Sequence, residues 1–313
     1  MVSMDERYFN DILNDGAHAF FEKAGWSQDV SYKLLPEISG GRYQAVRFPH
    51  CRIALLEAEG GVLHALQSAK NTLSIVAVLQ CDTAACLGRT KLKTGDLTVL
   101  DDKSIQLFFT AASYRLLVLN FDRRTFRSLS KLVSQYAGTV IDDGAKNIAS
   151  FALPILDTPP RPQQDPKDKS HTEHLHNSCQ TMLHELYSRA LPYRPKLTKG
   201  ETYALEICDR VYNHTEPTIS IKAFAKAYKV TEQTLQNAFK SLFGITPYKF
   251  VRNLKLNQVR QELLQANPVQ VTVIAIANKW GFVHMGHFSS YYTQLFGENP
   301  SVTLRRTVDA SEN

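Results

Sequence analysis

SLFGITPYKFVR, at residues 241–252, returns 53 residues later in altered form as QLFGENPSVTLR, at residues 294–305. The two stretches share Leu, Phe, Gly, Pro and the final Arg. Glycine followed closely by proline ends a helix, because glycine tolerates the left-handed conformation and proline cannot continue the helix. The repeated Phe-Gly-x-x-Pro therefore predicts two copies of one helical unit.

Each copy has a helical hairpin upstream of this stop signal. Ala225 and Ala277 stand 52 residues apart, each near the end of a short amphipathic helix that follows a capping residue, Ser220 or Thr272. A small Ala lets a second helix approach closely, and a turn of about three residues fixes a steep angle between the two helices. We therefore predict two helix-turn-helix units, joined by one helix over residues 248–265.

The positive charge of the chain is concentrated in the same region. Residues 217–308 hold eleven Lys or Arg residues against three Glu, a net charge of +8, whereas the whole chain carries +6 and the remainder therefore −2. A compact basic segment suits a polyanion, because each cation near a phosphate releases condensed counterions. A plain helical bundle with a duplicated hairpin is the alternative, but it needs neither this charge nor the repeated stop signal.

The amino-terminal half has a different pattern. Short β-branched and aromatic runs, separated by turn residues, follow one another over residues 42–122: YQAVRF, CRIALLEA, TLSIVAVL, DLTVL, IQLFF and YRLLVLNF. Such runs predict an antiparallel sandwich or barrel. We therefore expect an α+β chain, with a β domain at residues 1–156 and an all-α domain at residues 215–308.

The segment between these domains contains a linker and further helices. Residues 157–169, DTPPRPQQDPKDK, include four prolines and no apolar side chain that could anchor them in a core, so we expect a linker at residues 157–170. Residues 171–214 return to a helical period and are expected to form linker or dimerisation helices.

Composition and missing motifs exclude several classes of protein. Hydrophobic residues at 43% and charged residues at 21% fit a globular chain, and no apolar run approaches the ~20 residues of a membrane span. Five cysteines without C-x-x-C favour reduced thiols in a cytosolic compartment. ATP, dinucleotide, common hydrolase and zinc-protease motifs do not occur in the sequence. We expect a cytoplasmic protein that is not an enzyme.

One group of residues has the spacing of a metal site: His171, His174, His176 and Cys179 lie within a turn or two of one another. They follow the proline-rich stretch and begin a helix, where His is usually exposed. We therefore expect no metal and no other cofactor.

The run from ISIKAFAKAYKV to NPSVTLRR, at residues 219–306, resembles the carboxy-terminal DNA-binding domain of AraC/XylS-type transcription regulators. The resemblance implies that two helix-turn-helix units, joined by a rigid helix, place their recognition helices in successive segments of the major groove. Residues 1 to about 165 resemble, more weakly, the cupin-like β sensor domain of that family, through GDLTVLD at 95–101 and the strand at 114–121.

The resemblance also assigns contacts to the first recognition helix. Thr231 opens the helix, caps it with its hydroxyl and lies near a DNA phosphate. The expected base-facing residues are Gln233, Gln236 and Asn237. Their amides can bond in bidentate fashion to adenine, although an ordinary polar helix surface is the alternative. Lys240 and Arg252 are expected to contact phosphates.

Both units depart from the family pattern. In the first, Lys229 replaces the usual turn glycine, and in the second the cap position holds Val283, which cannot cap. The base-facing residues of the second unit are expected to be Met285, Gly286 and Ser290. Because Met and Gly offer no side-chain hydrogen bond, and Gly in a helix costs about 1 kcal/mol relative to Ala, we expect this helix to fray and to specify weakly. His284 and His287 are expected to reach phosphates.

The resemblance implies a sequence-specific DNA-binding transcription regulator, and we expect an activator that responds to a small-molecule effector bound in the mouth of the β domain. The expected partners are double-stranded DNA, RNA polymerase, the effector and a second copy in a homodimer, but no membrane. One alternative is an architectural or repressing DNA-binding protein with a non-functional sensor. Another is an enzyme with an incidentally basic tail, for which no nucleophile, carboxylate pair or metal set is found in the sequence.

Overall fold

The computed structural model describes residues 7–8, 26–33, 40–48, 50–59, 62–68, 70–81, 85–100, 106–110, 113–157, 170–189, 192–194, 196–213 and 220–309. These residues belong to two compact units. The first consists of most of the chain up to Lys196, and the second chiefly of Leu197–Asn313.

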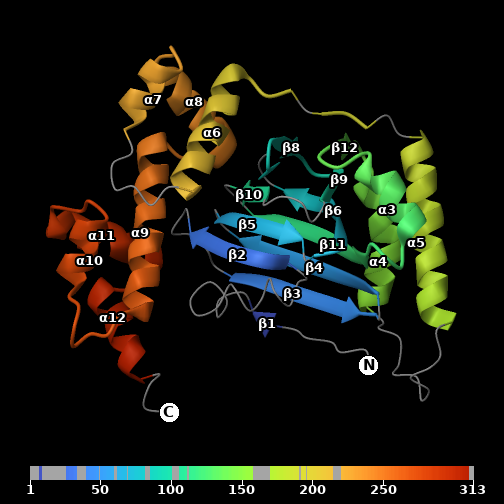
Figure 1. The fold of residues 1–313 in the computed structure, drawn as a ribbon, viewed down its shortest axis with the longest axis horizontal. Helices are drawn as coiled ribbons and strands as arrows, with labels where there is room; N and C mark the ends of the chain where they lie inside the picture. Colours follow the sequence, from blue (N-terminus) through green and yellow to red (C-terminus); the bar gives the residue numbers. More distant parts are fainter. Residues whose placement is uncertain are drawn as a thin grey trace. The chain divides into compact units, whose positions relative to one another are not determined.

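The described strands of the first unit form two sheets and no closed barrel, so the sandwich alternative is the one observed (Figure 1). The seven-stranded sheet has the order β1 (Arg7–Tyr8), β3 (Gly40–Arg47), β4 (Cys51–Glu59), β11 (Tyr114–Asp122), β6 (Thr72–Cys81), β9 (Leu97–Leu100) and β12 (Val140–Ile141). The five-stranded sheet has the order β2 (Trp26–Lys33), β5 (Val62–Ser68), β10 (Gln106–Thr110), β7 (Ala85–Leu87) and β8 (Thr90–Leu92). All six runs predicted from the sequence coincide with strands.

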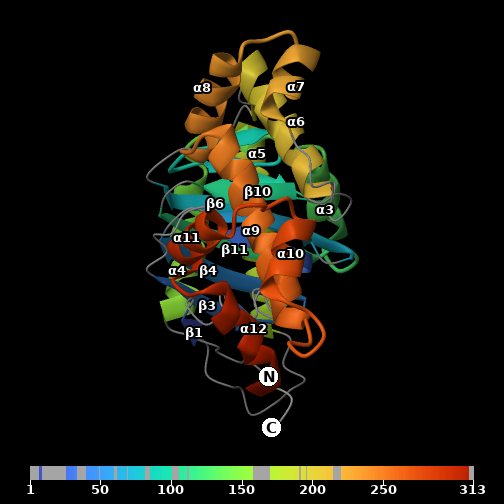
Figure 2. The same ribbon diagram turned by 90° about the vertical axis from the view of Figure 1, so that its left-hand side faces the viewer.

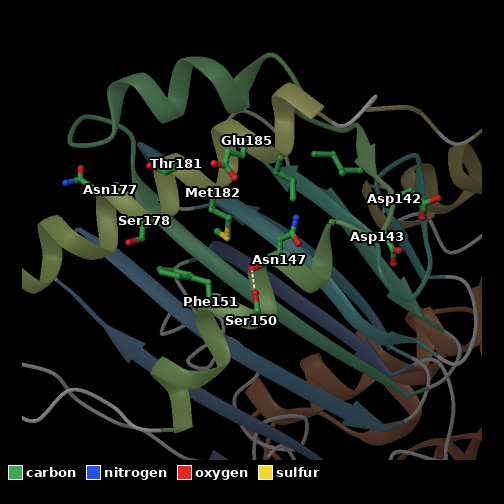
Figure 3. A pocket seen from close by; sticks show the side chains of 13 residues that line it. Asp142, Asp143, Asn147, Ser150, Phe151, Asn177, Ser178, Thr181, Met182 and Glu185 are labelled. Carbon is green, nitrogen blue, oxygen red and sulfur yellow. Dashed lines mark hydrogen bonds between the residues drawn. The ribbon is translucent and has the colours of Figure 1, made fainter.

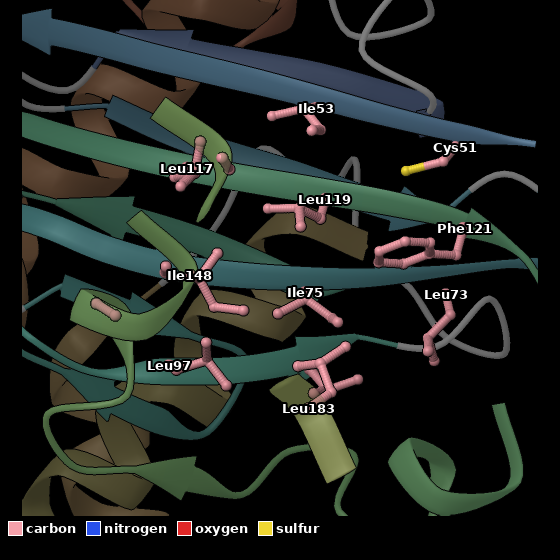
Figure 4. Packing of buried hydrophobic residues seen from close by; sticks show 14 of the residues in the cluster. Cys51, Ile53, Leu73, Ile75, Leu97, Leu117, Leu119, Phe121, Ile148 and Leu183 are labelled. Atoms are coloured by element: carbon pink, nitrogen blue, oxygen red, sulfur yellow. The ribbon is translucent and has the colours of Figure 1, made fainter. Parts of the chain in front are cut away.

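Strand β11 lies in the middle of the seven-stranded sheet. It pairs antiparallel with β4 on one side and β6 on the other, so that Leu117 lies opposite Leu55 and Ala77. Its sequence is an almost continuous apolar run because the strand is buried on both faces. Figure 4 shows Leu117, Leu119 and Phe121 from this strand pointing into the same cluster.

Helix α4 (Ala145–Asp157) covers one face of this sheet. It contacts β3, β4 and β6, and it presents Ile148, Ala152 and Leu156 to the sheet at four-residue spacing. The amide of Gln44 donates a 2.8 Å hydrogen bond to the carbonyl of Leu156 and so holds the end of the helix to β3. Two further helices, α3 (Arg127–Ser134) and α5 (Ser170–Arg189), pack against each other. The expected linker, residues 158–169, lies outside the described residues.

Beyond Leu197, the described part of the second unit consists of helices and the turns that connect them. The helices are α6 (Lys199–Asn213), α7 (Ile221–Ala227), α8 (Glu232–Phe243), α9 (Pro247–Gln265), α10 (Val273–Lys279), α11 (Met285–Phe296) and α12 (Pro300–Asp309). Figure 2 shows the long α9 running from the group around α7 and α8 to the group around α10, α11 and α12. The single connecting helix predicted over residues 248–265 is therefore confirmed.

Helix α9 contributes to the core of both groups. Phe250, near its start, packs its ring 5.3 Å from that of Phe239 in α8. Leu256, Val259 and Leu263, farther along, belong to the cluster that contains the buried residues of α10 and α11. Because one rigid helix is part of both cores, it fixes the distance between the two hairpins.

Candidate DNA-binding surface

The first hairpin is formed by α7, a short turn and α8. Ala225 of α7 is buried, and its carbonyl accepts a 3.0 Å hydrogen bond from the amide of Val230 across the turn. Lys229 stands in the turn with φ of 53°, the left-handed region that favours glycine. The expectation that Lys229 stands at the position of the usual turn glycine is therefore confirmed. Thr231 accepts from the amide of Thr234 and caps α8, also as predicted.

Helix α8 has one apolar and one polar face. Its buried residues are Leu235, Ala238, Phe239, Leu242 and Phe243. On the opposite face, Gln233, Asn237 and Lys240 are exposed and Gln236 is half-buried. Gln233 Nε2 donates a 2.8 Å hydrogen bond to Asn237 Oδ1. This bond aligns the two amides one turn apart and leaves Gln233 Oε1 and Asn237 Nδ2 as a neighbouring acceptor and donor.

Helix α6 supports α8 from behind. Thr198 and Glu201 cap the start of α6 reciprocally, since the Thr198 amide donates to Glu201 Oε2 at 2.9 Å and the Glu201 amide donates to Thr198 Oγ1 at 3.2 Å. The other carboxylate oxygen of Glu201 accepts a 2.9 Å hydrogen bond from Ser241 of α8. Gly200 permits the close contact, because a Cβ there would lie 3.2 Å from the Thr234 methyl. The contact of α6 with α8 was not predicted from the sequence, and α6 is part of the same compact unit as the two hairpins.

The second hairpin repeats the first with one additional residue. The carbonyl of buried Ala277 accepts from the amide of Phe282 at 3.0 Å, and Gly281 takes the turn position with φ of 81°. Lys229 and Gly281 are 52 residues apart, but the N-caps Thr231 and His284 are 53 apart. The expected cap at Val283 is therefore wrong: Val283 is the extra turn residue, and its side chain is 74% exposed.

The start of α11 lacks the support that the start of α8 has. His284 makes no side-chain capping hydrogen bond. Gly286, His287 and Ser290 are exposed, whereas Met285 is partly buried against the cluster of Phe288 and Tyr292. With the offset of 53 set by the caps, the counterpart of Gln236 is Ser289, a half-buried residue that was not among the base-facing residues expected from the sequence.

A ring stack runs along the exposed side of α11. The His287 ring stacks on that of Tyr291 at 6.1 Å, and the guanidinium of Arg252 from α9 lies 3.9 Å from the Tyr291 centroid. Arg252 also donates from Nε to Asn253 Oδ1 at 3.4 Å. Arg252 thus joins α9 to α11. From the sequence, it was expected only to contact a phosphate.

Buried charges hold the base of the second hairpin. Arg260 of α9, only 6% exposed, forms an ion pair with Glu298, which follows α11. Glu298 also accepts from Thr303 at 2.8 Å and pairs with Arg306 at 2.8 Å, both in α12. Burial raises the pKa of Glu298, but the hydrogen bonds from Thr303 and Arg260 and the charges of both arginines outweigh it, so the pKa lies below its usual range.

The first unit contains a cleft of about 880 Å³ between α4 and α5 (Figure 3). Asn147, Ser150 and Phe151 of α4 line one side, and Thr181 and Met182 of α5 line the other. The acidic lining residues are Asp142, Asp143 and Glu185. The cleft thus lies on the helical side of the unit and not in the mouth of the β domain, where the effector was expected.

The described residues contain no group of three or more His, Cys, Asp or Glu side chains that could hold a metal. The side chains of His171, His174, His176 and Cys179 lie outside that description. Among the described helices, none combines the length and the hydropathy that a membrane span requires.

Comparison with known proteins finds similarity in the region of the hairpins. Residues 224–306 match the family model of a helix-turn-helix domain. The chain is 32% identical over 117 residues to a probable thc operon regulatory protein of Rhodococcus erythropolis, and 30% identical over 113 residues to a XylDLEGF operon transcriptional activator of Pseudomonas putida. These alignments cover 37% and 36% of this chain but only 35% of each relative. Among solved structures, the AraC-like transcriptional activator CuxR aligns with 83% of this chain and 96% of its own, with a TM-score of 0.45 and 9% identity.

Proposed function

We propose that the whole chain is an AraC/XylS-type transcription activator that binds specific DNA sequences, because residues 224–306 match a helix-turn-helix domain and the relatives include a XylDLEGF operon transcriptional activator. The observation that carries the proposal is the exposed amide pair of Gln233 and Asn237 on a helix whose other face is fully packed. As an activator, the protein would act on RNA polymerase. We further propose that it forms a homodimer and that it is located in the cytoplasm.

The two hairpins divide the contacts with the duplex. In the first, Gln233, Gln236 and Asn237 read base edges, because a side-chain amide offers adenine a donor and an acceptor together. In the second, Met285, Gly286 and Ser290 lie against the bases by shape and apolar contact. The phosphate contacts are Thr231, Lys240, Arg252, His284 and His287. Helix α9 sets the spacing of the two recognition helices, so each reaches its own segment of the major groove.

The first unit is proposed to bind a small-molecule effector in the cleft between α4 and α5. Its lining combines buried apolar side chains, such as Ile141 and Leu186, with polar groups, which is the usual make-up of a small-molecule site. A compound library screened by thermal unfolding against the wild-type chain and Ser150→Trp tests this location. A compound whose stabilising effect survives Ser150→Trp places the effector elsewhere.

Selection of bound duplexes from a random-sequence pool tests the main proposal. The wild-type chain should enrich one sequence, and the triple variant Gln233→Ala, Gln236→Ala, Asn237→Ala should lose about 1–3 kcal/mol of discrimination per lost base contact. The double variant Gln265→Ala, Gln270→Ala is the control, since it removes two exposed amides of the same unit that lie outside both recognition helices. An unchanged preference in the triple variant contradicts the proposal.

The same selection decides the second candidate, an architectural DNA-binding protein. Equal affinity of the wild-type chain for all duplexes would favour that function, because architectural proteins read deformability and groove shape instead of base edges. No binding to any duplex would exclude both.

A further inference from the structure

Gly286 occupies the second position of helix α11, in ordinary helical conformation with no positive φ. Its position is exposed, and a Cβ built on it would meet no atom within 4 Å. Neither backbone conformation nor packing therefore requires a glycine here. Glycine inside a helix nevertheless costs about 1 kcal/mol relative to Ala.

Other glycines of the same unit have a reason in the fold. Gly281 and Gly297 have φ of 81° and 75°, which disfavour any other residue. Gly200 permits α6 to lie against α8, since a Cβ would come within 3.2 Å of Thr234. Gly286 has neither reason, and it stands at a helix start that also lacks a side-chain cap at His284.

The repeat supplies an internal comparison. The N-caps Thr231 and His284 are 53 residues apart, so Gly286 is the counterpart of Gln233. Both are the second residue of their helix, and both are exposed. Where α8 projects a long amide, α11 presents bare main chain on the corresponding face.

We propose that Gly286 determines how closely the second recognition helix approaches DNA: without a side chain, the main chain of α11 contacts the wall of the major groove, nearer than Gln233 permits for α8. This inference rests on the proposed function. Glycine is used where a backbone must approach a ligand closely, and the duplex is the ligand that the exposed face of α11 would meet. Ser290, one turn later on the same face, is small enough to leave that approach open.

Three single variants of the full chain, Gly286→Ala, Gly286→Ser and Gly286→Val, test the inference with the duplex that the wild-type chain enriches from a random pool. Gly286→Ala should raise the urea midpoint of unfolding, because it restores helix propensity and meets open space. Its affinity for the duplex should nevertheless fall about tenfold, and further for Val, in order of side-chain volume. Gln294→Ala is the control: it lies at the other end of α11, matches Ser241, and should leave affinity unchanged.

Each other result overturns the inference. Undiminished affinity of Gly286→Ala shows that nothing approaches this position. A loss of affinity that follows helix propensity, greatest for Ala and least for Val, shows that DNA binding depends on flexibility at the start of α11 and not on the space between α11 and the duplex. A lowered urea midpoint for Gly286→Ala shows that the fold itself needs the glycine. Failure of the wild-type chain to enrich any duplex is a distinct result, since it contradicts the proposed function on which the inference rests.

Discussion

The guanidinium of Arg252, in the connecting helix α9, lies over the ring of Tyr291 in the second recognition helix, 3.9 Å from its centroid. A cation held over an aromatic face is attracted by the ring quadrupole. The side chain therefore fixes α11 against α9, and its N–H groups at the edge of the guanidinium are still able to meet a phosphate.

We predict that Arg252 and Tyr291 are energetically coupled. In a double-mutant cycle of Arg252→Ala and Tyr291→Ala, followed by urea unfolding, the interaction free energy should be about 1 kcal/mol. A value near zero would show that the stack does not hold α11.

A separate measurement tests the proposed contact of Arg252 with a phosphate. If Arg252 neutralises a phosphate, Arg252→Ala should reduce the slope of log affinity for DNA against log salt concentration by about 0.9.

The second prediction concerns acid stability. Because the pKa of Glu298 is lower in the folded chain than its unfolded value, the carboxylate contributes stability that is fully present above the unfolded pKa of about 4.3 and is lost as the pH falls through the folded pKa. The unfolding free energy of the second unit should decrease over this range. Measured by urea unfolding at a series of pH values, Glu298→Gln should show a flatter acid limb.

At neutral pH the same variant should be destabilised by about 3 kcal/mol, because it leaves the buried Arg260 without its anionic partner. Glu232→Gln, which changes an acid near the surface, is the matched control and should cost far less. A loss at Glu298 no greater than that at Glu232 would contradict a structural role for the buried pair.

The third prediction concerns the strained turn. Lys229→Gly should stabilise the second unit by about 1 kcal/mol, since the left-handed conformation is costly for lysine and free for glycine. Gly281→Ala, at the matching turn position of the second hairpin, should destabilise by a similar amount. Chemical unfolding of both variants checks the pair. Destabilisation by Lys229→Gly would mean that the lysine side chain contributes more than the strain removes.

The fourth prediction concerns the contact of α6 with α8. Ser241→Ala removes the hydrogen bond to Glu201 and should cost about 1 kcal/mol of unfolding free energy. Gly200→Val should cost about 1–3 kcal/mol, because its branches cannot fit against Thr234. Unchanged thermal unfolding of both variants would show that α6 does not stabilise α8.

Local signals predicted much of this fold. The Phe-Gly-x-x-Pro repeat fixed the ends of α8 and α11, since Gly244 and Gly297 both take the left-handed C-cap conformation. Long apolar runs such as the one in β11 predicted six strands, but the mixed sequences of β2 and β5, of eight and seven residues, were not recognised as strands. Strands β7 and β8, of three residues each, are too short to leave a pattern.

The residues of the candidate DNA-binding surface were harder to predict from the sequence than the fold. The exposed amides on α8 follow from helical spacing and the repeat. In contrast, the offsets of 52 and 53 residues in the two halves of the repeat indicate one inserted residue but not its place, and the structure puts it in the turn at Val283. The stack of Arg252 on Tyr291 joins residues 39 positions apart and depends on how α9 and α11 pack, so no local sequence pattern predicts it.

The reciprocal cap between Thr198 and Glu201 has a practical consequence for dissecting this chain. A truncated polypeptide that starts just before α7 would lack α6 and would leave Ser241 and the neighbouring face of α8 open to water. The shortest piece suitable for isolation and binding measurements therefore begins at Leu197, and a shorter one would confuse lost folding with lost recognition.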